Sequence, residues 1–216
     1  MTAPVKDTLE KALSQKPVND EHKALMDEVK KQWEQYKAEG RKNLFDTKEW
    51  YALQTWNGGD NVAQLDLVKT LTYQAFDGFK WIQDLGMEFD KGVSQGAGSL
   101  WQRTHTSVMD MGTGFISTYA DQVEKNKDKI EIILQTTAKD IVMDGDKVVG
   151  VKVQNNHSQK EYTIKAKNGV IIATGGFAAN GEMIQKYNTT GKGDDLSKDA
   201  TTNRETSSQG DGIELG

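Results

Sequence analysis

The chain has 216 residues, enough for one large domain or two small ones. Apolar residues make up 36% and charged residues 27%, a balance that supports a folded core and argues against wholesale disorder. The formal charge of -5 comes from 32 acidic and 27 basic side chains. Because no segment concentrates Lys and Arg without compensating Asp and Glu, nucleic acid is not an expected partner.

The sequence contains no cysteine, which excludes disulfides, thiolate metal sites and a cysteine nucleophile. Its three histidines, His22, His105 and His157, are scattered, so their spacing predicts no metal site. Residues 1–13 lack the apolar run of a signal peptide, and no run of about eighteen apolar residues occurs elsewhere. We therefore expect no membrane segment. Cytoplasm is the default compartment, with a signal or anchor upstream of this sequence left open.

The first half of the chain has helical periodicity. Residues 5–39 carry apolar side chains at the three-and-four spacing of two amphipathic helices, the second capped by Asn19 or Asp20 and stopped by Gly40. Further helices are predicted to start at 46–49, to run over 64–85 and to run over 114–124, with a glycine-rich loop at 91–98.

The period then changes from near four to near two, which predicts strands rich in Ile and Val. Five are expected: Ile130–Gln135, Ala138–Met143, Val148–Gln154, Glu161–Ala166 and Gly169–Ala173. Turns at residues 144–146 and 155–158 join the second, third and fourth of them into an antiparallel meander.

The fifth strand, Gly169–Ala173, is almost continuously apolar, which predicts burial on both faces as in a parallel sheet. It leads into Thr174-Gly175-Gly176 and then a helix over 180–187. Open α/β sheets hold ligands at such strand ends, although a glycine turn that binds nothing is equally consistent. Neither GxGxxG nor GxxxxGK occurs, which argues against a self-contained dinucleotide domain.

Two other motifs have both a functional and a structural interpretation. Arg103-Thr104-His105 lies between glycine-rich stretches and could bind a carboxylate or phosphate through charge-assisted hydrogen bonds. The alternative, which the residues favour, is a solvated loop with a locally bonded histidine. Gly210-Asp211-Gly212 is either part of a site or no more than a turn.

At Val170–Asn180 (VIIATGGFAAN) the sequence strongly resembles the second flavin-contacting strand and turn of the fumarate reductase and succinate dehydrogenase flavoprotein superfamily. Similar stretches follow the family's order along roughly residues 40–216: 66–86, 96–114, 130–153 and 201–213. The resemblance is nearest to the soluble bacterial fumarate and urocanate reductases.

The resemblance implies an α/β fold, α+β in part: an incomplete glutathione-reductase-like FAD-binding domain with a three-stranded antiparallel meander and an N-terminal helical insertion. The implied domains are the insertion at 1–45, a partial FAD-binding domain at 46–188 and the start of a substrate-capping domain at 189–216. The family's glycine-fingerprint βαβ unit would precede Met1, and its proton-donating arginine would follow Gly216. The chain is thus expected to be an internal piece whose partners are the missing N- and C-terminal portions of the same enzyme.

The resemblance also assigns site residues. The positions that match the family's FAD contacts are Met111, Gly112, Ala138, Ala173, Thr174, Gly175 and Gly176. His105, Asn203 and Arg204 are the candidates for substrate binding, and no catalytic residue or metal ligand is expected within the chain. Arg204 stands where fumarate reductases of the family place a histidine after the asparagine, and its planar fork suits a carboxylate.

The implied activity is hydride transfer from flavin N5 to the C=C bond of a small unsaturated carboxylic acid, fumarate- or urocanate-like. Because the chain carries too few of the family's parts, we predict that alone it neither binds FAD tightly nor turns over. The competing hypothesis is a non-enzymatic truncated product, or a helical and β interaction module without flavin.

Overall fold

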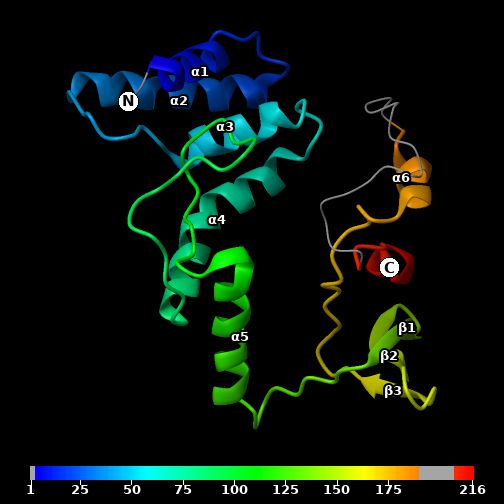
Figure 1. Ribbon diagram of the computed structural model, residues 1–216. Coiled ribbons are helices and arrows are strands. Elements are labelled where there is room, and N and C mark those ends of the chain that lie inside the picture. The colour runs from blue at the N-terminus through cyan, green and yellow to red at the C-terminus, as the bar shows by residue number, and fades with distance from the viewer. Residues whose placement is uncertain (1–2, 190–206) are drawn as a thin grey trace. The chain divides into compact units, whose positions relative to one another are not determined.

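The computed structural model describes residues 3–189 and 207–216. The chain divides into two compact units, Met1–Glu131 and Ile132–Gly216. The first is helical, and the second holds the sheet and two short helices (Figure 1). The finer domain boundaries at 45/46 and 188/189 stay a prediction.

The helices of the first unit follow the predicted periodicity. They are α1 (Ala3–Leu13), α2 (Asp20–Ala38), α3 (Lys48–Gly58), α4 (Leu65–Asp84), the 3-10 turn η1 (Asp110–Gly112) and α5 (Thr113–Lys125). The Asn19 side chain caps α2 by accepting a hydrogen bond from the backbone N–H of His22 at 2.8 Å. Thr47 caps α3 in the same way. Gly40 ends the α2 region with a φ of +62°, a conformation that costs glycine little.

An aromatic core lies between α2, α3 and the loop that follows α4. The rings of Trp33, Tyr36 and Phe45 pack against one another with centroids 5.2 to 5.4 Å apart. Trp50 and Trp101 are completely buried and meet edge to face at 5.0 Å. Leu9 of α1 joins the same core, so residues of the proposed insertion and of the remaining helices share one hydrophobic cluster.

Helix α4 buries only part of the apolar repeat that predicts it, which consists of Leu67, Val68, Leu71, Ala75, Phe79 and Ile82. Leu65, Val68 and Thr72 are its buried residues. Leu67 and Leu71, which belong to the same apolar repeat, are 66% and 58% exposed. The period of the helix was therefore predictable, but the identity of its packed face was not, because that face is chosen by contact with α3.

His22 is buried in this core as a neutral ring. Its Nδ1 accepts a hydrogen bond from the backbone N–H of Val18 at 3.2 Å, which requires that nitrogen to be unprotonated, and its ring meets Trp56 edge to face. Burial lowers the pKa of His22 below its ordinary value of 6.5, and the side chain of Asn57 opposes that shift.

We expect the first unit to lose stability as the pH falls below 6.5. Below that value the unfolded chain takes up a proton before the folded chain does, so the free energy of unfolding falls by up to about 1.4 kcal/mol per pH unit until the folded pKa is reached. All five tryptophans, Trp33, Trp50, Trp56, Trp81 and Trp101, belong to the first unit, so urea unfolding followed by tryptophan fluorescence reports on it.

In His22→Gln the dependence of the free energy of unfolding on pH below 6.5 should disappear, whatever the absolute stability of the variant. His157→Gln changes an exposed turn residue of the second unit and should leave the slope unchanged. A slope that survives in His22→Gln would assign the pH dependence to other groups.

The second unit confirms the predicted meander. Strands β1 (Thr136–Asp144), β2 (Lys147–Asn155) and β3 (Glu161–Lys165) form an antiparallel sheet in the order β1-β2-β3. Gly145 has a φ of +59° in the turn between β1 and β2, as an Asp-Gly turn allows. The helices of this unit are α6 (Gly181–Tyr187) and α7 (Asp211–Leu215).

Two of the five predicted strands are wrong. Neither Ile130–Gln135 nor Gly169–Ala173 lies in a strand of the described residues. The expected burial of the second segment on both faces is wrong as well, since Ile171 is 92% exposed and Ile172 is 45% exposed. A strand exists only where a neighbour supplies ladder hydrogen bonds, and these apolar segments have none among the described residues.

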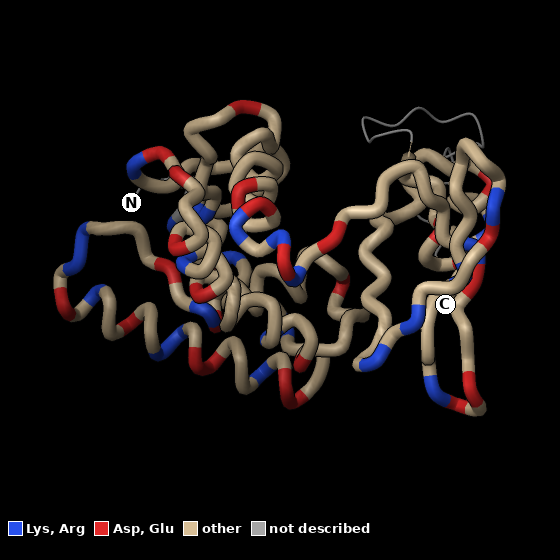
Figure 2. Tube along the Cα trace, turned by 90° about the horizontal axis from the view of Figure 1, so that it is seen from below, with Lys and Arg blue, Asp and Glu red and all other residues tan. Residues whose placement is uncertain are grey.

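Charges are interspersed along the chain (Figure 2). On α2 they form pairs one turn apart, such as Lys23 with Asp27 at 2.6 Å and Lys37 with Glu34 at 2.9 Å. Such exposed pairs contribute little to stability. Within the described residues, no helix is long and apolar enough to cross a membrane.

Candidate functional site

The glycine turn after Ala173 is open to an incoming group. Ala173, Thr174, Gly175 and Gly176 are all exposed. A Cβ atom built on Gly175 or on Gly176 would meet nothing within 4 Å, and Gly175 has a φ of +77°. The backbone here is free to approach a ligand closely.

Residues 208–212 pack against this turn and bond to it. The backbone N–H of Gly210 donates to the carbonyl of Gly176 at 3.1 Å, and that of Ala179 donates to Ser208 at 3.0 Å. A Cβ on Gly212 would lie 2.2 Å from Thr174 Oγ1 and 2.5 Å from a methyl carbon of Ile172, so a larger residue there would force these side chains to move. The Gly-Asp-Gly motif is therefore more than a turn, because it packs against the candidate cofactor segment.

Ala138 lies in the same unit, on an irregular part of β1. It pairs with Val153, and the register shifts between Ala138 and Asp140 as in a β-bulge. Helix α7 lies against β1, and Gly212 of α7 touches Thr174. Helix α7 thus contacts both β1, the strand that carries Ala138, and the glycine turn.

Met111 and Gly112 lie in the first unit and have an unusual backbone. Both are left-handed, with φ of 55° and 79°, and the Met111 side chain is fully exposed. A non-glycine residue in this region is uncommon and costs free energy, and such residues are often found at ligand sites. The two residues precede α5, so that helix holds them at its N-terminal end.

His105 is half-buried and stacks on an aromatic ring. Its imidazole lies 3.8 Å from the ring of Phe79 on α4, centroid to centroid, at an interplanar angle of 25°. The histidine lines a cleft of about 630 Å³ between α3, α4 and its own loop. Phe79 lines the same cleft, together with the aromatic residues Tyr51, Tyr73 and Phe76.

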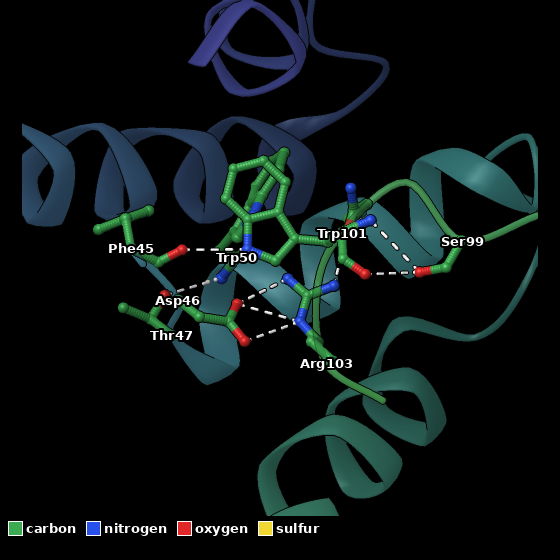
Figure 3. A network of polar contacts seen from close by, with 8 residues as sticks. Phe45, Asp46, Thr47, Trp50, Ser99, Trp101 and Arg103 are labelled. Atoms are coloured by element: carbon green, nitrogen blue, oxygen red, sulfur yellow. Dashed lines mark hydrogen bonds and ion pairs between the residues drawn. The ribbon is translucent and has the colours of Figure 1, made fainter. Parts of the chain in front are cut away.

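Arg103, two residues before His105, is hydrogen-bonded to other residues of the protein (Figure 3). Its Nε donates to both carboxylate oxygens of Asp46, at 3.0 and 2.9 Å, and its Nη2 donates to Asp46 Oδ1 at 2.7 Å. Its Nη1 donates to Gln54 Oε1 at 2.5 Å, and its guanidinium lies 4.4 Å from the ring centroid of Tyr51. The bonds to Asp46 and Gln54 use three of the five guanidinium N–H groups. The solvated-loop alternative does not hold for Arg103, whose side chain is 17% exposed. Ligand binding by this arginine stays a prediction.

Trp101 anchors the same loop two residues earlier. Its indole Nε1 donates to the carbonyl of Phe45 at 3.0 Å, and Ser99 Oγ donates to the Trp101 carbonyl at 2.7 Å (Figure 3). Burial raises the pKa of the Asp46 carboxyl above its ordinary value, while the bonds from Arg103 act in the opposite direction. Sequence reasoning missed Asp46 and Gln54, since the former precedes Arg103 by 57 positions and no spacing rule links them.

Asn203 and Arg204, the other two substrate candidates, lie outside the described residues. The remaining candidates divide between the units: His105, Met111 and Gly112 in the first, and Ala138 with the glycine turn in the second. Within the described residues, no group of three or more His, Asp and Glu side chains is placed to hold a metal ion.

A known protein-family model covers most of the chain. The model of the family described as "FAD binding domain" matches residues 37–216. The chain belongs to this FAD-binding family. The match spans Met111, Gly112, Ala138 and the glycine turn, and it confirms the predicted superfamily and cofactor.

Individual relatives of this FAD-binding chain are reductases by name. It is 34% identical over 186 residues to the NADH:acrylate oxidoreductase of Vibrio harveyi, covering 82% of this chain and 18% of the relative. It is 31% identical over 176 residues to the NADH:fumarate oxidoreductase of Klebsiella pneumoniae, covering 81% and 18%. It is 30% identical over 155 residues to the urocanate reductase of Eggerthella lenta, covering 68% and 24%. The chain therefore spans less than a quarter of the length of these relatives.

A solved structure supports the same fold. The open conformation of a flavocytochrome c3 fumarate reductase matches with a TM-score of 0.68 and 29% identity, over 84% of this chain and 30% of that chain. This likeness confirms the predicted partial α/β FAD-binding fold with its antiparallel meander.

FAD is the cofactor of the family, and the residues of this chain fit it. The open space beside Gly175 and Gly176, which would let a cofactor approach the backbone, is the observation that supports the fit. Ala173 and Thr174 add two more small exposed residues beside that space.

Proposed function

We propose that this chain forms part of an FAD-dependent oxidoreductase that reduces the C=C bond of a small unsaturated carboxylic acid. The observation that carries the proposal is the open glycine turn at 174–176, held in place by Gly210 and Gly212, within a chain of the FAD-binding family. When bound, reduced FAD supplies the hydride.

The proposed role of the chain's own residues is to bind FAD and to orient it. The turn at Gly175 and Gly176 exposes backbone amides, which can donate to an anionic or carbonyl group of the cofactor. Met111 and Gly112, held in left-handed conformations before α5, form the proposed contact beside the flavin ring. Ala138 on the β1 bulge is the proposed backbone contact of the adenosine half.

His105 is the proposed substrate contact among the described residues, since its imidazole lines the cleft and is held flat on Phe79. Asn203 and Arg204 complete the proposed substrate-binding set, with Arg204 as the carboxylate partner. Relatives named for acrylate, fumarate and urocanate support an unsaturated acid as substrate.

A chimaera tests the activity. Residues 37–216 would replace the matching segment of the Vibrio harveyi NADH:acrylate oxidoreductase. The purified chimaera should retain FAD, and its reduced flavin should be reoxidised by one of acrylate, fumarate or urocanate. A folded chimaera that retains FAD but transfers electrons to none of these acids would contradict the proposed substrate class.

Gly176→Val tests the cofactor turn. Because open space surrounds this position, the substitution should leave the fold intact and yet lower FAD affinity in the chimaera about tenfold or more, since the side chain would occupy the ligand's space. Gly58→Ala, also in open space but at the end of α3, is the matched control and should retain normal FAD affinity. Equal FAD content in Gly176→Val and the control would exclude this turn from the cofactor site.

The 216-residue chain by itself should bind FAD only weakly, because its candidate contacts involve few residues. Isothermal titration with FAD is the measurement. Submicromolar binding, with a yellow stoichiometric complex, would show that the turn and Ala138 suffice and that our expectation is wrong.

A further inference from the structure

We propose that Arg103 is a positioning residue for His105: its bonds to Asp46 and Gln54 lock the histidine loop onto helix α3, so that the N-terminal helices determine where the imidazole lies. This inference rests on the proposed function only for the substrate role of His105. The positioning itself concerns contacts within the first unit.

Side chains of the loop that carries His105 alternate between buried and exposed positions. From Trp101 to His105, side chains point inward at every second position: Trp101 is buried, Arg103 and His105 are half-buried, and the residues between them are exposed. An extended segment has this period of two. The three inward side chains therefore share one face, and Arg103 is the middle one.

The two arms of the loop are paired only over a short stretch. Its two arms are joined by isolated bridges between Ser94 and Thr104 and between Phe89 and Ser107. Ser94 and Thr104 exchange backbone hydrogen bonds at 2.9 and 3.0 Å. Beyond His105, the backbone N–H of Asp90 donates to Thr106 at 2.8 Å and that of Val108 donates to Glu88 at 3.2 Å. A short pairing of this kind is weak, and a slip by one residue would turn His105 away from Phe79.

Arg103 adds a side-chain constraint to this short backbone pairing. Four charge-assisted hydrogen bonds fix its planar guanidinium, three to Asp46 and one to Gln54. The Tyr51 ring covers one face of that guanidinium at 4.4 Å. The Arg103 side chain is 17% exposed and that of Asp46 is 32% exposed, so solvent screens this pair less than the exposed pairs on α2.

Arg103 therefore connects the loop that carries His105 to helix α3, which lies far from it in the sequence. Asp46 stands just before α3, Gln54 lies within α3, and His105 faces Phe79 on α4. The histidine is therefore held between two helices, by its own stacking on one side and through Arg103 on the other. The arginine never needs to touch a substrate to affect substrate binding.

NMR of the histidine ring protons tests the link in the full 216-residue chain. In the unchanged chain we expect contacts between the His105 and Phe79 ring protons in nuclear Overhauser spectra, and His105 signals displaced by the stacked ring. In Arg103→Met these contacts should weaken or vanish, and the signals should shift toward those of His157, which is exposed and serves as an internal reference. Asp46→Asn should cause the same shift, and the double variant no more than the larger single effect.

Arg41→Met is the matched control, because Arg41 also pairs with a carboxylate, Glu39, but on the exposed surface. It should leave the His105 signals unchanged. Gln54→Leu removes only the bond from Arg103 Nη1. If Arg103→Met and Asp46→Asn unfold, the His105 signals of Gln54→Leu test the proposal, and we expect them to shift in the same direction. Unchanged His105 signals in variants whose tryptophan fluorescence remains native would overturn the proposal.

The chimaera separates this inference from the proposed function. There, Arg103→Met should raise the KM for the unsaturated acid while FAD content stays normal. A shift of the His105 signals without a change in KM would leave the positioning intact and remove His105 from the substrate site. Unshifted His105 signals in Arg103→Met would contradict the proposed positioning role, even if the chimaera is active.

Discussion

Trp101→Ala is expected to destabilise the first unit by about 3–5 kcal/mol, the usual range for removing a large buried aromatic side chain. Trp101 has no exposed surface and packs edge to face against the equally buried Trp50. It also ties residues far apart in the chain together, because its indole N–H donates to Phe45, 56 positions earlier. Truncation removes the ring and leaves the Phe45 carbonyl without this donor, and each of these changes raises the free energy of the folded unit.

Urea unfolding followed by the remaining tryptophans measures the change. Trp81→Ala is the matched control, because Trp81 is 56% exposed on α4 and its loss should cost less than about 1 kcal/mol. Trp101→Phe retains most of the packed ring and should lose mainly the hydrogen bond, about 1–2 kcal/mol. Equal destabilisation by Trp101→Ala and Trp81→Ala would mean that the loop contributes little to the aromatic core.

Local signals in the sequence predicted the secondary structure of both units where local chemistry decides it. Asn19 caps α2, Gly40 follows it with a positive φ, and Gly145 allows the turn between β1 and β2. Each of these depends on a few neighbouring residues, so the sequence pattern is sufficient. The antiparallel meander followed because its two connections are short.

Predictions that depended on distant partners were less successful. Gly169–Ala173 has the composition of a buried strand, but a strand also needs a neighbour, and none pairs with it among the described residues. The role of Arg103 depends on Asp46 and Gln54, which no spacing rule connects to it. The alternation from Trp101 to His105 was the one signal that could have indicated an inward-facing arginine.

The candidate site was predicted by resemblance more than by physical pattern. The residues alone gave the glycine turn at 174–176 even odds of binding nothing. Its open surroundings, and the packing of Gly212 against Thr174, now provide a physical reason to consider it a ligand site. Met111 gains similar support from its left-handed backbone, which no periodicity in the sequence indicated.

Gly150→Ala is expected to have the second-largest effect, a loss of about 1–3 kcal/mol in the stability of the meander, as for other overpacked positions. A Cβ on Gly150 of β2 would lie 2.5 Å from the backbone carbonyl oxygen of Ile164 on β3. Backbone in a paired strand cannot rotate away as a flexible side chain can, so the strands must separate. The sheet has little core to resist this, because Val153 is its one buried hydrophobic side chain among the described residues.

Amide hydrogen exchange is the suitable measurement, since no tryptophan lies in the second unit and protection can be assigned strand by strand. Gly150→Ala should speed exchange at amides that bridge β2 and β3, including Ala166, which donates to Val149 at 2.8 Å. Gly176→Ala, in open space within the same unit, should leave exchange in the sheet unchanged. Equal exchange rates at these amides in Gly150→Ala and Gly176→Ala would mean that the close approach of β2 and β3 does not require glycine at position 150.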